Sequence, residues 1–271
     1  MVLDLRRGFG DFYDYKLFKF PDNSTKFELK TGGTVTKVVT TLRTNDDIVA
    51  LLLISDVLKR KGFKPELYIT YMMYQQDDRL FDEDESFGLR VISKLLNGLN
   101  FGKIKIFHPH SDKVELIDNV EIVSNETFIT QVLYNMYRGK ITSAKDLTWI
   151  IPDSGAFKTQ FKQIEHLHID NFVTCMKSRD HGTGDIITVV NTEDLQGKDC
   201  IIFDDICLGG RTFINIAEEL KKKNCGKLYL YVSHGVFNKG LEELYKYFEV
   251  IYTTDSICTI PEDDKLKVFK L

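Results

Sequence analysis

Short apolar runs alternate with segments whose apolar residues recur at helical spacing along almost the whole chain. Runs rich in β-branched and aromatic residues predict strands at residues 34–42, 66–73, 103–107, 147–151, 171–176, 186–191, 201–203, 228–234 and 250–254. Apolar residues three and four positions apart predict helices at residues 46–61, 86–99, 127–137, 156–167, 213–223 and 239–247. Asp46 or Asp47 is placed to cap the first helix. Because strands alternate with helices, we predict an α/β fold in which helices flank mainly parallel sheets.

One stretch, residues 199–213, joins a buried strand to a helix through polar and glycine residues. These residues are, in chain order, Asp204, Asp205, Gly209, Gly210 and Thr212. A glycine loop that leads into a helix N-terminus presents backbone N–H groups to an anion. Carboxylates before such a loop can bind sugar hydroxyls or a magnesium ion. The stretch therefore predicts a site for a phosphorylated sugar, and an ordinary strand-to-helix turn with exposed acids is the plainer alternative.

Composition narrows the class of protein. The 271 residues, 43% hydrophobic and 28% charged, are enough for one large globular domain or two of ordinary size. The net charge of −4 and the scattered lysines give no basic surface for nucleic acid. The five cysteines form no CxxC pair, so we expect neither disulfides nor a structural zinc site. The sequence has no signal peptide and no apolar run of membrane-spanning length, so we expect a cytoplasmic protein without membrane partners.

Two further strands also end in residues that carry chemistry. His108 and His110 follow the strand at 103–107, and Asp153 follows the strand at 147–151. Ligands of parallel α/β folds bind beyond the carboxyl ends of the strands. Two histidines two positions apart can reach one metal ion or one phosphate, and a polar turn is the plainer alternative.

A polar, glycine-punctuated loop at residues 176–185 carries the cations Lys177 and Arg179. Such a loop is typical of a lid over a polyphosphate, where cations neutralise charge on a transferred phosphoryl group. A solvent-exposed hairpin loop is the alternative. No Walker A motif is present, so the chain is not a P-loop nucleotidase.

The order of these motifs resembles that of the ribose-phosphate pyrophosphokinases, or phosphoribosyl diphosphate synthetases. The motifs are Arg-x-x-Asp-Asp after a strand, Tyr-x-x-Tyr-x-x-x-Asp-Arg, His-Pro-His-Ser, Pro-Asp-x-Gly, Lys-x-Arg, Asp-Asp with its glycine loop, and Ser-His-Gly-Val-Phe. The resemblance runs from about residue 42 to residue 257. It is greatest to a short form that often accompanies nicotinamide phosphoribosyltransferase in NAD salvage.

This resemblance implies a fold and a reaction. The family has two type-I phosphoribosyltransferase-like halves related by a pseudo-twofold axis, which here correspond to residues 1–142 on the ATP side and 143–271 with the ribose-phosphate loop. It moves the β,γ-diphosphate of Mg-ATP to the C1 hydroxyl of ribose 5-phosphate, giving phosphoribosyl diphosphate and AMP. Because its ATP site is built across subunits, a homo-oligomer is implied.

The resemblance also implies a role for each matching residue. The catalytic residues are Lys177, Arg179 and His110. The ATP-binding residues are Gln76, Asp78, Arg79, His110 and Phe20. The ribose-phosphate site consists of Asp204, Asp205, Gly209, Gly210, Arg211 and Thr212. His110 and Asp153 are the metal-associated residues, and the metal is Mg²⁺.

Several positions depart from the family pattern. In the ATP region Gln76 replaces an arginine, His108 replaces an aspartate, and residues 20–24 match the adenine-holding segment poorly. In the phosphate loop Leu208 replaces the third aspartate, and Arg211 stands where glycine is expected. A guanidinium there suits an acceptor with more phosphate than ribose 5-phosphate carries.

The departures leave alternatives to phosphoribosyl diphosphate synthesis from ribose 5-phosphate open. The nearest is the same reaction with ADP-ribose as acceptor, giving ADP-ribose 1-pyrophosphate for NAD regeneration. Another is a regulatory homologue that has lost activity, which the replacements at Gln76 and His108 favour. Against it, the chain retains the catalytic and metal-associated residues Lys177, Arg179, His110 and Asp153. A base-accepting phosphoribosyltransferase shares the loop, but the two halves and His110 argue against it.

Overall fold

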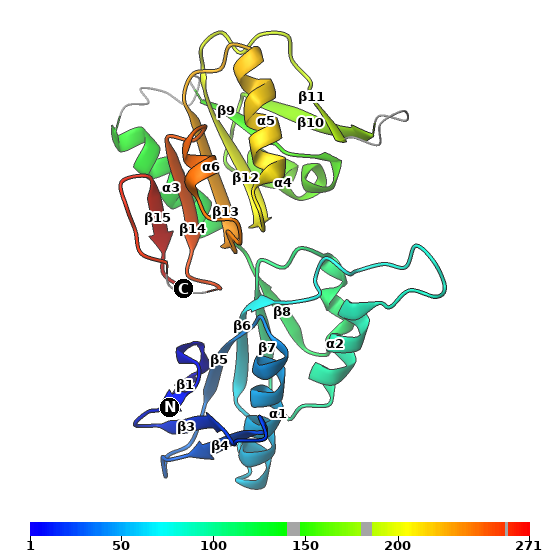
Figure 1. The fold of residues 1–271 in the computed structure, drawn as a ribbon, viewed down its shortest axis with the longest axis vertical. Coiled ribbons are helices and arrows are strands. Elements are labelled where there is room, and N and C mark those ends of the chain that lie inside the picture. The colour runs from blue at the N-terminus through cyan, green and yellow to red at the C-terminus, as the bar shows by residue number, and fades with distance from the viewer. Residues whose placement is uncertain (140–146, 180–185, 258–259) are drawn as a thin grey trace. The chain divides into compact units, whose positions relative to one another are not determined.

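The computed structural model describes residues 1–139, 147–179, 186–257 and 260–271. The chain divides into two compact units (Figure 1). Unit 1 consists of Met1–Ser124 with the short segment Ser256–Cys258, and unit 2 consists of Asn125–Asp255 with Thr259–Leu271. Among the described residues, no helix has both the length and the apolar character needed to cross a membrane.

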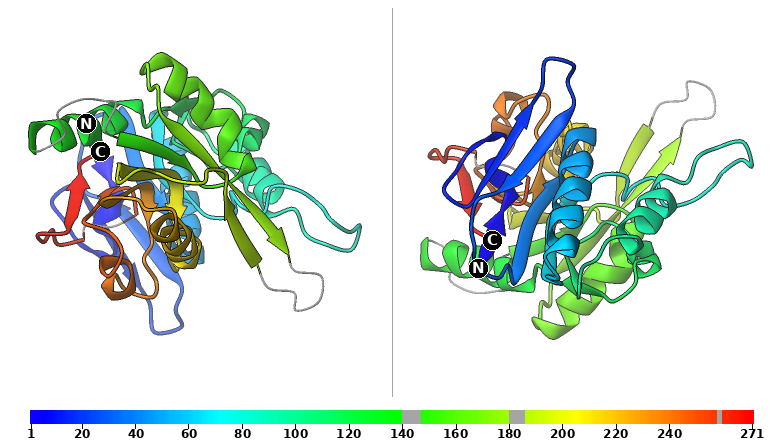
Figure 2. Two further views of the ribbon diagram at one scale, coloured as in Figure 1. Left: turned by 90° about the horizontal axis from the view of Figure 1, so that it is seen from above. Right: turned by 90° about the horizontal axis from the view of Figure 1, so that it is seen from below.

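The described part of unit 1 contains a five-stranded parallel sheet of order β1-β5-β6-β7-β8. Its strands are β1 (Val2–Asp4), β5 (Lys37–Leu42), β6 (Glu66–Met72), β7 (Ile104–Phe107) and β8 (Val120–Val123). Its helices are η1 (Leu5–Arg7), α1 (Asn45–Arg60), α2 (Gly88–Asn97) and η2 (Asp112–Leu116). A three-stranded antiparallel sheet consists of β2 (Gly10–Asp11), β3 (Tyr15–Lys19) and β4 (Thr25–Leu29). The segment between β6 and α2 protrudes from this unit (Figures 1 and 2).

The start of α1 shows why the chain turns into a helix directly after β5. Thr44 is the N-cap residue, and its side chain accepts a hydrogen bond from the Asp47 backbone N–H. The Asp47 carboxylate in turn accepts from the Thr44 backbone, which completes a capping box. The expected cap at Asp46 or Asp47 was therefore wrong by two or three residues, because the hydroxyl of Thr44 is the group that accepts from the unpaired Asp47 N–H in the first turn.

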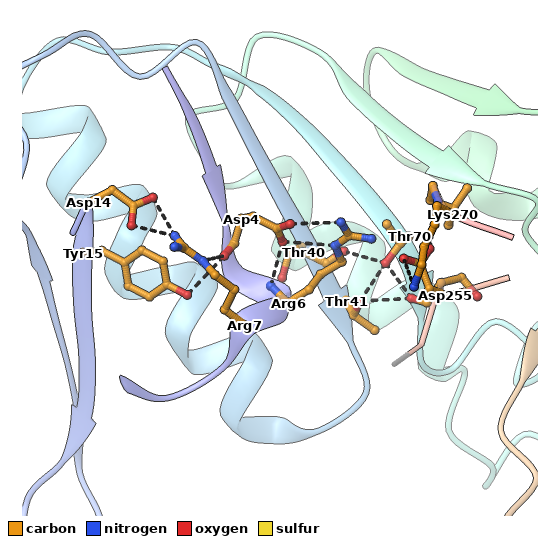
Figure 3. Close-up of polar contacts among 12 residues, drawn as sticks. Asp4, Arg6, Arg7, Asp14, Tyr15, Thr40, Thr41, Thr70, Asp255 and Lys270 are labelled. Atoms are coloured by element: carbon orange, nitrogen blue, oxygen red, sulfur yellow. Dashed lines mark hydrogen bonds and ion pairs between the residues drawn. The ribbon is translucent and has the colours of Figure 1, made fainter. Parts of the chain in front are cut away.

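Polar contacts fix the N-terminal segment and the segment at 256–257 in unit 1 (Figure 3). Arg7 donates through Nη2 to both carboxylate oxygens of Asp14, each at 2.6 Å. The buried hydroxyls of Thr41 and Thr70 lie 2.7 Å apart, and both donate to the carbonyl oxygen of Ser256. These buried hydrogen bonds replace those that the two hydroxyls would form with water. They therefore hold the segment at 256–257 and leave neither hydroxyl unsatisfied.

The described part of unit 2 contains a seven-stranded sheet that is parallel except for the pairing of β10 with β11. In spatial order its strands are β11 (Ile186–Val190), β10 (Phe172–Arg179), β9 (Leu147–Ile151), β12 (Asp199–Cys207), β13 (Leu228–Gly235), β14 (Val250–Thr254) and β15 (Leu266–Phe269). Its helices are α3 (Glu126–Gly139), α4 (Ser154–His166), α5 (Arg211–Lys222) and α6 (Glu242–Tyr245). The β10–β11 hairpin extends beyond the other strands (Figures 1 and 2).

Two hydrophobic cores lie on opposite faces of this sheet. On β12, Ile201 and Phe203 belong to the core under α3 and α4, whereas Cys200 and Ile202 belong to the core under α5 and α6. This alternation is the period of two that a strand buried on both faces requires. The α/β fold with mainly parallel sheets flanked by helices is thus confirmed.

Two predicted boundaries need correction. The strand predicted at 201–203 extends to Cys207, because β13 pairs with β12 from Cys200 to Cys207, so Asp204 and Asp205 lie inside a strand. The helix predicted at 239–247 shortens to α6, because the preceding residues form a turn closed by a hydrogen bond from the Gly240 N–H to the Phe237 carbonyl.

The division into compact units falls earlier than the predicted boundary after residue 142, which itself lies outside the described residues. The reason is α3: its buried Ile129, Val132 and Met136 pack with Leu147 and Trp149 of β9. These contacts place the whole helix with the C-terminal sheet. The division at 142 and 143 into two functional domains stays a prediction.

Candidate functional site

The topology of unit 2 singles out the carboxyl ends of β9 and β12. From β9 the chain passes through α4 to β10 on one side, and β12 lies on the other side of β9. Ligands of open α/β sheets bind in the crevice at such a switch point. The β9–β12 ladder ends at the pair Ile150 and Ile202, whereas β12 continues beside β13 to Cys207. The two strands therefore separate where Asp153 and Asp204 follow.

The carboxyl groups of Asp204, Asp205 and Asp153 interact electrostatically at this point. Burial raises the pKa of Asp204 well above its usual value, and the negative charges of Asp205 and Asp153 raise it further. The Asp205 backbone N–H donates to Asp204 Oδ1 at 3.0 Å, which partly offsets the effect. A group that donates hydrogen bonds to these oxygens, or a cation, would relieve the repulsion. The strand end is thus suited to hydroxyls or a divalent cation.

A metal ion at this point would need ligands besides protein side chains. In the part of the chain that the structure describes, no three His, Cys, Asp or Glu side chains gather closely enough to hold one. Asp153 is also the N-cap of α4, where its Oδ1 accepts from the Ala156 N–H at 3.0 Å. Mg²⁺ is usually bound by one or two carboxylates together with substrate phosphates and water, so the carboxylates of Asp153 and Asp204 fit that ion.

The loop after β12 leads into a helix whose N-terminus has no side-chain cap. Gly210 is the N-cap residue of α5, with φ of +79°, and Arg211 is the first helical residue. The helix predicted at residues 213–223 thus begins two residues earlier. Because the N-cap residue makes no side-chain cap bond, this helix N-terminus is suited to an anion. The expected ribose-phosphate residues Gly209 to Thr212 lie together at this N-terminus.

A second loop supports the first. The N–H groups of Val236 and Phe237 donate to the Cys207 carbonyl at 2.9 and 3.2 Å, and the Asn238 N–H donates to the Leu208 carbonyl at 2.9 Å. Together these bonds fix the loop after β13 against the phosphate loop. They are contacts between segments about 30 residues apart in sequence, so no local pattern could reveal them.

The two expected lid cations, Lys177 and Arg179, lie in β10 by their backbone rather than in the loop after it. Lys177 is paired with Thr188 and Arg179 with Ile186 across the hairpin. The strand runs farther than predicted because β11 pairs with it up to this point. Residues 180–185 of the predicted lid lie outside the described residues, and so do the side chains of Lys177 and Arg179.

In unit 1, the loops after β6 and β7 are joined by side chains. The backbone N–H of His110 donates to Gln75 Oε1 at 2.8 Å, and Gln75 is only 2% exposed. Ser111 Oγ donates to Asp78 Oδ2 at 2.8 Å, so the loop that carries Asp78 is held beside the His-Pro-His-Ser turn. The sequence did not single out Gln75; its burial within a polar loop is the signal that only the structure supplies.

Asp78 lies in a cationic and hydrogen-bonding environment. Burial opposes its charge, but hydrogen bonds from Arg79 and Ser111 and the charges of Arg79 and Lys113 lower its pKa overall. The Arg79 guanidinium lies 2.9 Å from Asp78 Oδ1 while remaining mostly exposed, and Lys113 Nζ donates to the Asp78 carbonyl at 2.6 Å. Asp78 is therefore held in its ionised form and fixes the exposed Arg79 guanidinium beside it.

The other expected ATP residues are not all brought together. Gln76 is exposed in the same loop as Asp78, and His108, with φ of +36°, ends β7 two residues before His110. Phe20 instead follows β3 in the three-stranded sheet, where its ring packs edge-on against Phe18 with centroids 5.2 Å apart. The structure thus groups Gln76, Asp78, Arg79 and His110 on two neighbouring loops and leaves Phe20 on a separate element.

Gln160 of α4 fixes the strand that carries the two aspartates. Its Oε1 accepts from Trp149 Nε1 at 2.8 Å, and its Nε2 donates to the Phe203 carbonyl at 2.7 Å. The Trp149 and Phe203 rings stack with centroids 3.9 Å apart. Beyond the last β9–β12 pair, Gln160 thus satisfies the carbonyl directly before Asp204 in place of a neighbouring strand.

We expect Gln160→Leu to lower the free energy of unfolding by about 2–4 kcal/mol. The leucine fills a similar volume but leaves the Trp149 N–H and the Phe203 carbonyl buried without a partner, at about 1–3 kcal/mol for each group. Urea unfolding followed by Trp149 fluorescence measures the loss. Thr159→Leu, on an exposed position of the same helix, is the control and should change stability little. Equal stability of the two variants would contradict the assigned role of Gln160.

The sequence matches no family model, but curated proteins and solved structures resemble it. The chain is 28% identical over 260 residues to the ribose-phosphate pyrophosphokinase of Thermococcus kodakarensis, covering 94% of this chain and 90% of that protein. It is 26% identical over 254 residues to that of Pyrococcus abyssi, covering 92% and 86%. The crystal structure of phosphoribosylpyrophosphate synthetase from Mycobacterium smegmatis matches with a TM-score of 0.82 at 19% identity, covering 94% of this chain and 85% of that one.

These findings define the class first: an α/β protein with the fold of a phosphoribosylpyrophosphate synthetase. Within that class, the chain is a homologue of the ribose-phosphate pyrophosphokinases, a family of enzymes. The resemblance to the ribose-phosphate pyrophosphokinases is therefore confirmed, and so is the prediction of an enzyme of this type, whereas the association with NAD salvage stays a prediction.

Proposed function

We propose that this protein transfers the β,γ-diphosphate of Mg-ATP to the C1 hydroxyl of ribose 5-phosphate, giving phosphoribosyl diphosphate and AMP. The observation that carries the proposal is the junction of β12 and α5. There, the carboxylates of Asp204 and Asp205 precede a helix N-terminus without a side-chain cap, at the switch point of a parallel sheet. The ribose-phosphate pyrophosphokinases found as homologues over most of the chain support the reaction.

The acceptor belongs to unit 2. The N–H groups of the first turn of α5 bind the 5-phosphate, and the dipole of the helix adds to their attraction. Asp204 and Asp205 accept hydrogen bonds from the ribose hydroxyls, which orients the C1 hydroxyl for attack. The donor belongs to the loops after β6 and β7 of unit 1, where Arg79 and His110 face the ATP phosphates and Gln76 replaces a family arginine.

The chemistry is an in-line displacement that needs no covalent enzyme intermediate. The C1 hydroxyl loses its proton to solvent and its oxygen forms a bond to the β-phosphorus of ATP. The bond from that phosphorus to the oxygen bridging the α- and β-phosphates breaks, and AMP leaves with that oxygen. Lys177 and Arg179, in the role that the family resemblance gives them, neutralise the charge that builds on the transferred diphosphate. Mg²⁺, when bound, supplies further charge neutralisation, and Asp153 and Asp204 offer it the oxygen ligands that it prefers.

The direct test is to incubate the purified protein with Mg-ATP and ribose 5-phosphate and to measure AMP and phosphoribosyl diphosphate by chromatography. We expect equal amounts of both products and no AMP without the sugar. AMP release that does not depend on any sugar would indicate an ATP pyrophosphatase and contradict the proposal. A parallel incubation in EDTA should abolish turnover, because the proposed donor is the magnesium complex.

A second acceptor, ADP-ribose, is favoured by the composition of the phosphate loop. Leu208 is 41% exposed where the family has an acid, and Arg211 adds a guanidinium at the first position of α5. Loss of a negative charge and gain of a positive one suit a diphosphate diester better than a terminal phosphate alone. The product would be ADP-ribose 1-pyrophosphate, which serves NAD regeneration. Mg-ATP incubations with each sugar separately decide between the two, since turnover with ribose 5-phosphate alone excludes ADP-ribose.

The remaining expectations are proposals of the same kind. We infer that the protein acts in the cytoplasm as a homo-oligomer in nucleotide or NAD salvage. Multi-angle light scattering of the full chain tests the oligomer. A non-catalytic regulatory role would be indicated if the pure protein formed no AMP with either sugar but changed the rate of an active ribose-phosphate pyrophosphokinase when mixed with it.

A further inference from the structure

Lys239 lies across the phosphate loop of unit 2, although no sequence motif marks it. A Cβ atom built on Gly209 would lie 3.3 Å from Lys239 Cδ and 3.5 Å from Lys239 Cε. The aliphatic stem of the lysine therefore covers the backbone of Gly209, and its ammonium is one bond farther along. The absence of a side chain at Gly209 is what allows this close approach.

The position of Lys239 is fixed by the turn that carries it. The Asn238 N–H donates to the Leu208 carbonyl at 2.9 Å, one residue before Gly209. The turn closes through the Gly240 N–H and the Phe237 carbonyl at 2.9 Å, and both of these residues have positive φ, +78° and +46°. With the bonds from the Val236 and Phe237 N–H groups to the Cys207 carbonyl, three backbone hydrogen bonds tie the turn to the phosphate loop and set the register of Lys239 on it.

Lys239 and Arg211 are both exposed cations, and within the described residues neither forms an ion pair with a carboxylate. Three other lysines of unit 2, Lys222, Lys227 and Lys246, each pair with a glutamate. Two uncompensated cations beside a helix N-terminus increase its attraction for a phosphate, since both the charges and the dipole act in the same direction.

We propose that Lys239 is an acceptor-binding residue that contacts the phosphate held at the N-terminus of α5. The inference rests on the proposed function of this loop and adds a residue to it. Leu208 has removed an acid from the loop and Arg211 has added a cation, so Lys239 continues the same change toward positive charge. Lysine suits this role as a mobile point charge that follows a phosphate without requiring bidentate geometry.

The test compares Lys239→Met with Lys246→Met, which removes the same charge from the end of α6. Rates of AMP formation are measured with the acceptor varied at saturating Mg-ATP. We expect Lys239→Met to raise the KM for the acceptor about tenfold, with kcat and the KM for ATP changed less than twofold, because only ground-state binding of the acceptor is affected. Lys246→Met should behave as the wild type.

Calorimetric binding of inorganic phosphate to the full chain, without ATP, gives a readout that does not depend on turnover. We expect the Kd for phosphate to rise about tenfold in Lys239→Met and to stay unchanged in Lys246→Met. If the wild type forms no AMP with either sugar but shows this difference, the proposed reaction fails and the role of Lys239 stands. If AMP forms while both variants bind phosphate and acceptor as the wild type does, the role of Lys239 is overturned and the reaction stands. Absence of phosphate binding to the wild type would also overturn it.

Discussion

Asp204→Asn is expected to stabilise the protein at neutral pH and at the same time to remove most of its activity. The Asp204 carboxyl is held beside Asp205 and Asp153, and burial and these charges raise its pKa well above the usual value. An asparagine has nearly the same shape, keeps an oxygen that accepts from the Asp205 N–H, and carries no charge to be repelled. We expect a higher melting temperature, by about 2–4 °C for each kcal/mol of repulsion relieved.

The activity of Asp204→Asn should fall because the proposed acceptor site loses its charged hydrogen-bond acceptor. Hydrogen bonds to charged groups contribute about 1.5–3 kcal/mol each, so kcat/KM for the acceptor should fall by about 10²-fold. The KM for ATP should change little. A variant that gains stability while losing acceptor use would identify Asp204 as a group maintained for function at a cost in stability, as functional sites often are.

The pH dependence of the stability difference between Asp204→Asn and the wild type distinguishes relief of charge repulsion from a simple packing effect. Well below the ordinary aspartate pKa of 3.8, the carboxyl is protonated in both the folded and the unfolded chain, so the two proteins should differ little. As pH rises above the ordinary value, the unfolded chain loses this proton before the folded chain does, and the stability of the wild type falls relative to Asp204→Asn. The stability difference should therefore be larger at pH 8 than at pH 5. Glu193→Gln, an exposed neutralisation in the same unit, should show no such trend.

Several elements could be predicted from the sequence because their signals are local. β9 ends at Ile151 as the apolar run before Pro152 indicates, and α5 follows the glycines at 209 and 210. The short strands β1 and β15 could not be predicted, because their pairing with β5 and β14 depends on partners far away in the sequence. The same cause explains why β12 includes Asp204: the extra residues are held by β13, not by any local preference.

In the candidate site, too, residues marked by a local sequence signal could be predicted, and residues defined by distant contacts could not. Asp204, Asp205 and the glycine loop were visible because their residue types and spacing define the chemistry. Gln75, Gln160 and Lys239 were not, because each acts through a contact with a residue at least 11 positions away. Lys239 was moreover assigned to a helix, and only the turn before α6 shows that it lies against Gly209. Apart from Lys239, the residues proposed to carry the chemistry could be read from the sequence, whereas Gln75 and Gln160, which position loops and strands by hydrogen bonds, required the fold.

Gly210→Val is expected to lower kcat/KM for the acceptor by about 10²-fold while leaving the KM for ATP unchanged. Gly210 has φ of +79°, a conformation that a β-branched residue adopts only with strain, at about 1–2 kcal/mol. A Cβ at this position would also lie 3.0 Å from Leu244 Cδ2 and 3.2 Å from two further atoms of that side chain. Leu244 is buried in the core that α5 covers, so the loop has to move instead, and the amides proposed to bind the phosphate move with it.

Gly197→Val provides a matched control for this prediction. Gly197 has φ of +72°, so a valine there bears the same backbone strain, but no atom lies within 4 Å of its Cβ position. Both variants should therefore unfold at lower urea concentration than the wild type. Only Gly210→Val should also lose acceptor binding, because only there does the strain act on the amides at the start of α5. Equal losses of acceptor use in both variants would mean that general destabilisation, and not the geometry of the phosphate loop, limits the reaction.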